Sequence, residues 1–100
     1  MNMQQMIAQA QRMQRELKKA KEALYTQEFT ASRSGLVSVT MYGNKTVKAV
    51  EIKPEGLTKE NLEMIQDLIA ACVNALVKKI ADEEEKIEEA ITGQKGGVGF

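Results

Sequence analysis

Apolar residues in the first 25 positions recur at alternating intervals of three and four. This seven-residue repeat is typical of a helix that packs lengthwise against another helix. Residues 2–26 contain neither Gly nor Pro and are rich in Gln, Lys, Ala, Met and Leu, which favour helix. The sequence therefore predicts one long helix over this range. Its apolar seam consists of Met3, Met6, Ala10, Met13, Leu17, Ala20 and Leu24.

From residue 29 the pattern changes to alternating polarity with many β-branched residues, which is typical of strands. We expect three strands, near residues 28–32, over 36–42 and over 46–52. Ser34-Gly35 and Gly43-Asn44 are turn signals between them. The result is an antiparallel meander with one apolar face, which Val37, Val39, Met41, Val50 and Ile52 would share.

A second long helix is predicted after Pro54-Glu55-Gly56, with Thr58 as its N-cap. Its wide apolar face is suited to lie on the sheet: Ile65, Leu68, Ile69, Cys72, Val73, Leu76, Val77 and Ile80. Beyond Ile80 the segment 82–89 is strongly acidic, and like charges one turn apart weaken a helix. We therefore expect this part to project from the body, with a break near Ala81. Residues 93–100 hold four Gly and predict a flexible tail.

The predicted fold class is α+β, with the order helix, three-stranded meander, helix in a single domain over residues 1–92. A 24-residue helix is about 36 Å long, whereas a seven-residue strand is about 23 Å. The helices must therefore extend past the sheet, and their seams need cover from each other or from a second copy. A symmetric dimer is the commonest solution.

Composition narrows the function classes. The 100 residues are 43% hydrophobic and 28% charged, which is typical of a soluble globular domain. No run approaches the ~20 apolar residues of a membrane span, and no secretory signal is expected at the start. The single Cys72, inside an apolar run, predicts a buried thiol in a reducing compartment.

The chain has little with which to do chemistry. It contains no His, and no Ser or Thr stands in a recognisable nucleophile motif, so we expect no enzyme and no small-molecule substrate. The acidic segment lies on one predicted helix, where carboxylates do not converge on a metal ion. No cofactor is expected.

Charge is unevenly distributed although the net charge is zero. Residues 1–27 carry five basic and two acidic groups, whereas residues 59–92 carry four basic and nine acidic groups. The basic groups of the first helix are candidate phosphate contacts, because each cation that neutralises a phosphate releases counterions. They are Arg12, Arg15, Lys18, Lys19 and Lys21, with Lys45 and Lys48 on the second hairpin as weaker candidates.

The ordered set of residues resembles the YbaB/EbfC family of nucleoid-associated proteins over residues 3–90. The block IAQAQRMQ at residues 7–14 is similar to the family's N-terminal signature. Similar positions in the strands are Gly35-Leu36-Val37, Val39-Thr40, Gly43, Val47, Val50-Glu51-Ile52 and Pro54-Glu55; those in the second helix are Leu62, Leu68, Ala70-Ala71 and Asn74-Ala75.

This resemblance implies a small cytoplasmic homodimer with strands joined across the two-fold axis and paired helices that project as arms. It also implies binding of duplex DNA with little sequence preference, in the nucleoid, with roles in chromosome organisation and gene regulation. The N-terminal helix would then supply the phosphate contacts. The residues expected in dimer or helix packing are Met6, Met13, Leu17, Leu24, Val37 and Val39.

Two other interpretations stay open from the residues alone. The basic helix face could be only solvated, or paired with the acidic segment 82–89. The competing function is a protein-interaction module, in which the acidic arm and the Met/Leu seam clamp a partner protein and any DNA association is secondary. Charge also does not separate duplex RNA from duplex DNA.

Overall fold

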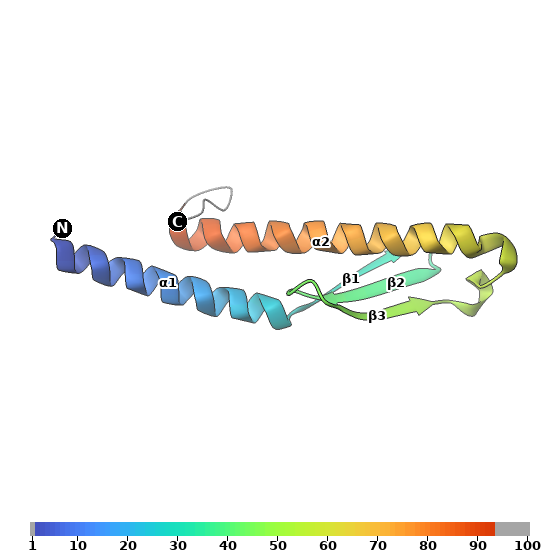
Figure 1. Cartoon of the computed structure of the whole chain (residues 1–100), viewed down its shortest axis with the longest axis horizontal. Helices are drawn as coiled ribbons and strands as arrows, with labels where there is room; N and C mark the ends of the chain where they lie inside the picture. The colour runs from blue at the N-terminus through green and yellow to red at the C-terminus, as the bar shows by residue number, and fades with distance from the viewer. Residues whose placement is uncertain (1, 94–100) are drawn as a thin grey trace.

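The computed structural model describes residues 2–93. Helix α1 (Met3–Thr26) is followed by strands β1 (Glu28–Arg33), β2 (Val37–Tyr42) and β3 (Val47–Ile52) and by helix α2 (Leu62–Thr92) (Figure 1). The strands form one antiparallel sheet in the order β1-β2-β3. The α-β-β-β-α order predicted from the sequence is confirmed. The expected tail at 93–100 lies outside the described residues except for Gly93, the left-handed C-cap of α2.

The core lies between one face of the sheet and α2. Along β2, the buried residues alternate with half-buried ones that point away from α2. Val37 pairs with Ile52 and Val39 with Val50, so these four side chains share a face, as predicted. From α2, residues spaced at four and seven positions close the core. Its buried hydrophobic members are Leu24, Phe29, Val37, Val39, Met41, Ile65, Cys72, Leu76 and Ile80.

Helix α2 begins and continues differently from the prediction. Two short 3-10 turns, Pro54–Gly56 and Lys59–Asn61, precede it, and Thr58 caps the second of these rather than α2. The helix then runs unbroken through Ala81. The expected break is wrong because Ile87 continues the apolar stripe onto the core, and because Glu84 and Glu88 find partners on α1.

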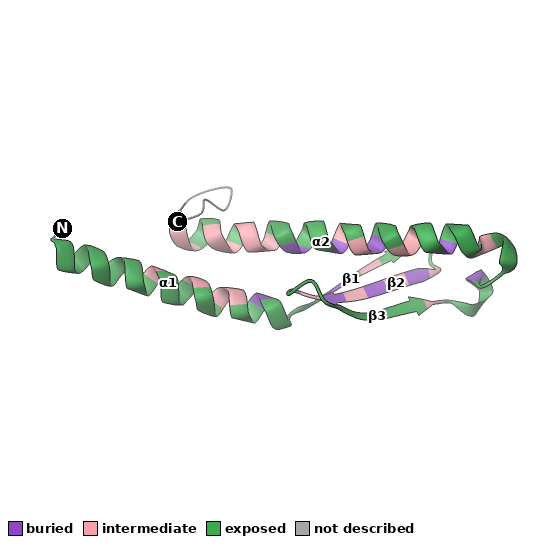
Figure 2. Ribbon diagram, in the orientation of Figure 1, coloured by how far each residue is buried: buried purple, intermediate pink, exposed green. Residues whose placement is uncertain are grey.

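Helix α1 begins with a capping box, in which the side chains of Asn2 and Gln5 each accept a hydrogen bond from the other's backbone N–H. From its C-terminal end on the sheet it runs back alongside the second half of α2 and past it, so both termini lie at the same end of the molecule (Figure 1). Of its residues only Leu24 is buried, and residues 2–12 are all exposed (Figure 2).

Candidate nucleic-acid interface

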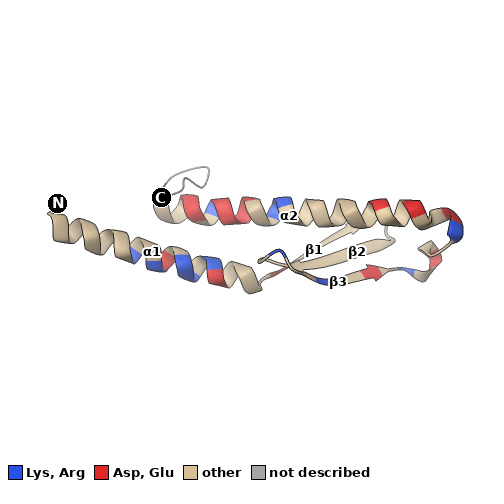
Figure 3. Ribbon diagram, viewed as in Figure 1, with Lys and Arg blue, Asp and Glu red and all other residues tan. Residues whose placement is uncertain are grey.

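Four cations lie exposed along the middle of α1: Arg12, Arg15, Lys18 and Lys19. None of the four makes a salt bridge to any of residues 2–93. Figure 3 shows this basic segment of α1 beside the acidic second half of α2. The proximity raises the question of how far the acidic side chains neutralise the basic ones.

The rotation of α1 keeps most of its cations away from α2. At 3.6 residues per turn, Lys21 lies about two and a half turns from Arg12 and thus on the opposite side of the helix. Lys21 contacts α2, and Arg12 on the other side is exposed, although it also lines a shallow hollow with Ile91 of α2. Lys19 follows Arg12 two turns later. Arg15 lies next to these two residues, and we call Arg12, Arg15 and Lys19 the outer row. Lys18 lies on the flank and lines a groove with Leu17 and Lys21.

Lys21 is engaged within the chain. Its ammonium lies 2.9 Å from the Glu88 carboxylate, and the two side chains are only 26% and 23% exposed. The hydrogen bond to Glu88 raises the pKa of Lys21 above its ordinary value of 10.5. One turn further along both helices, the Tyr25 hydroxyl donates to Glu84 at 3.3 Å. The pairing between basic α1 and acidic α2 that the sequence left open therefore involves Lys21. Arg12, Arg15 and Lys19 make no salt bridge within residues 2–93.

The second hairpin carries the two weaker candidates. Lys45 is exposed in the turn, with a left-handed backbone at φ 68°. Lys48 donates to Glu28 at 2.8 Å and lies 5.9 Å from the centre of the Tyr42 ring. The hydrogen bond to Glu28 raises the pKa of Lys48 above 10.5. Lys48 is therefore already paired across the outer face of the sheet.

The six residues expected in packing divide into three groups. Val37, Val39 and Leu24 are buried in the core of the chain itself. Met13 and Leu17 are half-buried beside the C-terminal end of α2. Met6 is 57% exposed and contributes to an uncovered apolar tip of α1 together with Met3 and Ile7.

A second uncovered apolar surface lies on β3. Helix α2 packs mainly over β1 and β2, so Val47 and Val50 remain 43% and 44% exposed. Both residues are on the α2 side of the sheet, since they pair with Met41 and Val39. β3 is also an edge strand, with one row of backbone groups turned away from β2.

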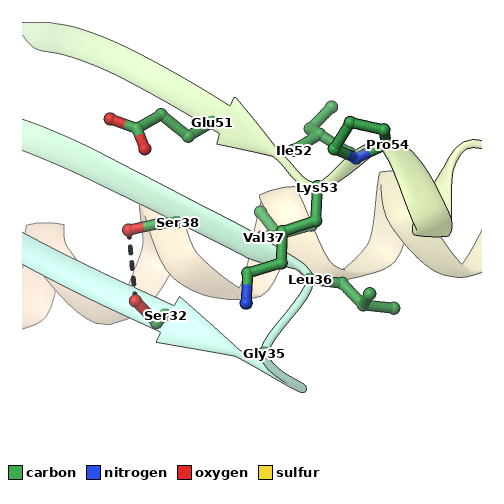
Figure 4. A pocket seen from close by; sticks show the side chains of 9 residues that line it. All are labelled: Ser32, Gly35, Leu36, Val37, Ser38, Glu51, Ile52, Lys53 and Pro54. Carbon is green, nitrogen blue, oxygen red and sulfur yellow. Dashed lines mark hydrogen bonds between the residues drawn. The ribbon is translucent and has the colours of Figure 1, made fainter.

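A shallow hollow of about 360 Å³ lies at the far end of the sheet (Figure 4). The hydroxyl of Ser32 on β1 donates a hydrogen bond to the hydroxyl of Ser38 on β2 at 3.1 Å. Glu51 and Lys53 are its charged residues.

Tyr25 and Glu84 were not among the predicted site residues, and neither were the three lysines on the solvent face of α2. These lysines, Lys78, Lys79 and Lys86, are exposed and interleaved with Asp82 and Glu83. Lys86 pairs with Glu83 at 3.5 Å. The mixed charge makes this face a weaker anion surface than the outer face of α1. The pairing of Tyr25 with Glu84 had one signal in the sequence: Glu84 and Glu88 are four residues apart, as are Lys21 and Tyr25.

Within residues 2–93 no three His, Cys, Asp or Glu side chains are grouped as metal ligands. In the same range, neither helix combines the length and the apolar character needed to cross a membrane.

Comparison with known proteins decides the family. The family model described as the YbaB/EbfC DNA-binding family matches residues 1–95. The chain belongs to this family. The YbaB/EbfC assignment agrees with the helix–meander–helix order.

Curated YbaB/EbfC relatives match nearly the whole chain. A nucleoid-associated protein of Acinetobacter baumannii is 46% identical over 99 residues, which cover 93% of this chain and 90% of that protein. One from Acetivibrio thermocellus is 40% identical over 99 residues, covering 97% and 87%. Among solved structures, an uncharacterized protein from Helicobacter pylori shares the fold, with a TM-score of 0.76 at 20% identity, over 92% of this chain and 98% of that one.

Proposed function

We propose that the chain acts as a homodimer that binds duplex DNA with little sequence preference and thereby contributes to nucleoid organisation and gene regulation. The observation that carries the proposal is the outer row of Arg12, Arg15 and Lys19, which is exposed and makes no salt bridge within residues 2–93. Contacts from such a row to phosphates do not depend on base sequence. Lys18 on the flank and Lys45 on the hairpin are additional candidates.

Two features support a second copy. The inner face of β3 and the tip of α1 leave large apolar side chains exposed, among them Val47, Val50 and Met6. Apolar surfaces that the chain itself leaves open are typical of interfaces. A dimer would also double the number of cations presented to one duplex. The site on each protomer would be the same outer face of α1.

The competing function is a protein-interaction module in which the acidic segment 82–89 masks the basic helix. The contacts favour DNA, because Glu84 and Glu88 engage Tyr25 and Lys21 rather than the outer row. The observation that supports the protein-interaction module is the exposed apolar tip of α1.

The test is a titration of unrelated DNA duplexes and one RNA duplex at several salt concentrations, with the mass of the protein recorded. The slope of log affinity against log salt falls by about 0.9 for each phosphate contact. Four cations thus predict a slope of about −3.6 for one chain and about −7 for a dimer on one duplex. We expect similar affinities for all DNA duplexes in a species of twice the chain mass.

The triple variant Arg12→Ala, Arg15→Ala, Lys19→Ala should weaken binding more than tenfold on every duplex and flatten the slope by about 2.7 per chain. The matched control is Lys59→Ala, Lys78→Ala, Lys79→Ala, which removes the same charge elsewhere. Equal losses in both variants would indicate a response to net charge alone. An unchanged affinity in the α1 variant would exclude this face.

A further inference from the structure

The contacts between α1 and α2 form a regular ladder. Tyr25 contacts Glu84, and Lys21 contacts Glu88. Leu17 and Thr92 then line the same hollow. Each step is four residues along both helices, in opposite directions, so the three pairs lie on one side of each helix. We call these three pairs the arm ladder.

Apolar packing alone does little to fix the rotation of α1 at this point. Leu24 is buried, but Leu17 and Met13 are only half-buried and Met6 is exposed. The polar pairs of the arm ladder stand where the core ends. Lys21 and Glu88 are each about three-quarters shielded from solvent, so their directional hydrogen bond can hold one rotation of the helix.

That rotation determines where the outer row points. With Lys21 held on α2, Lys19 lies two residues away and thus on the opposite side of a helix about 10 Å in diameter. This separation is close to one Debye length at physiological salt, so much of the field of the acidic segment is screened there. A rotated α1 would instead bring cations of the outer row toward the carboxylates of α2.

We propose that Glu88, together with Glu84, is a positioning residue for the DNA-binding face: by anchoring Lys21 and Tyr25 it holds the outer row of α1 toward the nucleic acid. The inference rests on the proposed function. It has an unusual consequence, because removing a negative charge at Glu88 should weaken binding of an anion. A carboxylate that only repels phosphate would give the opposite sign.

The experiment compares Glu88→Gln with Glu89→Gln. Both remove one negative charge from adjacent positions of α2, but Glu89 is exposed and its side chain makes no hydrogen bond or salt bridge within residues 2–93. A mixed-sequence duplex is titrated at several salt concentrations. We expect Glu88→Gln to lose roughly three- to tenfold in affinity and to flatten the salt slope by about 0.9 or more, one phosphate contact. Glu89→Gln should bind as tightly as the wild type or more tightly, with an unchanged slope.

The reversed pair Lys21→Glu, Glu88→Lys adds a rescue. It keeps the ion pair and the net charge, so the affinity for the duplex and the salt slope should return toward those of the wild type. Tighter or unchanged DNA binding by Glu88→Gln would overturn the proposal. So would a lower melting temperature with an unchanged salt slope, which would mean a structural role alone.

Amide hydrogen exchange of the free protein separates this proposal from the proposed function. Glu88→Gln should speed exchange in residues 12–20 of α1, whereas Glu89→Gln should not. If the wild type binds no duplex, the proposed function fails, while exchange still shows whether Glu88 holds α1. Equal exchange in both variants would overturn the positioning role itself.

Discussion

At the residue scale, Gly43 is required by a close approach between two segments. Its N–H donates to the carbonyl of Gln27 at 2.9 Å, and a Cβ there would overlap the Leu24 carbonyl oxygen and lie 2.6 Å from its carbon. The sequence marks Gly43 as a turn residue, but the left-handed residue of that turn is Lys45. Gly43 is thus needed because α1 ends directly against the hairpin.

Replacing Gly43 with Ala should lower the free energy of unfolding by about 2 kcal/mol or more, because the backbone of Leu24 cannot yield as a flexible side chain would. Urea denaturation measures the change. Gly35→Asn is the control. Gly35 has a left-handed backbone and open space around it, and Asn tolerates that backbone, so the cost should stay below about 1 kcal/mol. Equal destabilisation by both changes would contradict the steric account.

Lys21 makes a pH-dependent contribution to stability. Its pKa is raised above 10.5 in the folded chain, chiefly by the hydrogen bond to Glu88. The folded state therefore holds the proton more tightly. The contribution is fully present below the unfolded pKa and is lost as pH rises through the folded pKa.

We expect Lys21→Met to cost about 1 kcal/mol or less at pH 8, since the pair is partly exposed. The difference from the wild type should shrink as pH rises from 10.5 through the higher pKa that Lys21 has in the folded chain. Urea denaturation at several pH values measures it. Lys18→Met, which removes an exposed ammonium without a salt bridge in residues 2–93, should show no such trend. A constant difference across the pH range for Lys21→Met would contradict the account.

At the element scale, the local signals were strong enough to locate both helices and all three strands. Strict alternation placed Val37 and Val39 in the core, and an uninterrupted seam without Gly or Pro defined α1. The start of α2 was misplaced because the 3-10 turns before it have the same cap and acidic signals as a helix start. The prediction of a break near Ala81 was wrong because it considered the repulsion between neighbouring carboxylates and not the partners that Glu84 and Glu88 find on α1.

In the candidate site too, the features that depend on neighbouring residues were predictable, and those that depend on distant residues were not. The outward position of Arg12, Arg15 and Lys19 follows from the seam, since residues opposite an apolar stripe face solvent. The pairing of Lys21 with Glu88 joins residues 67 positions apart, and that of Lys48 with Glu28 joins strands at opposite edges of the sheet. Nothing in the local sequence distinguishes these paired lysines from the unpaired ones.

At the scale of the whole molecule, the chain is long and thin. Its radius of gyration is 19.1 Å and its extents are 69 × 20 × 15 Å, whereas a compact chain of this length has a radius near 13 Å. An elongated shape buries little apolar surface per residue, so contacts with another chain matter more to it. The uncovered inner face of β3 is the part of the sheet where such a contact would extend the core.

A charge on that face should therefore separate the proposed dimer. Val50→Asp places a carboxylate beside Val47, on the side of the sheet that a second copy would cover, and desolvating it would oppose association. We expect at least tenfold weaker self-association in analytical ultracentrifugation. Ala49→Asp puts the same charge on the same strand but on the outer face, and should leave the mass at twice that of the chain.

The same pair of variants links assembly to DNA binding. If each protomer contributes its own four cations, Arg12, Arg15, Lys18 and Lys19, Val50→Asp should bring the salt slope from about −7 toward about −3.6. Dissociation by Ala49→Asp but not by Val50→Asp would place the interface on the hydroxyl-lined face of the sheet instead. A slope that stays steep in a Val50→Asp monomer would mean that one chain makes all the phosphate contacts, from more cations than the outer row of α1 supplies.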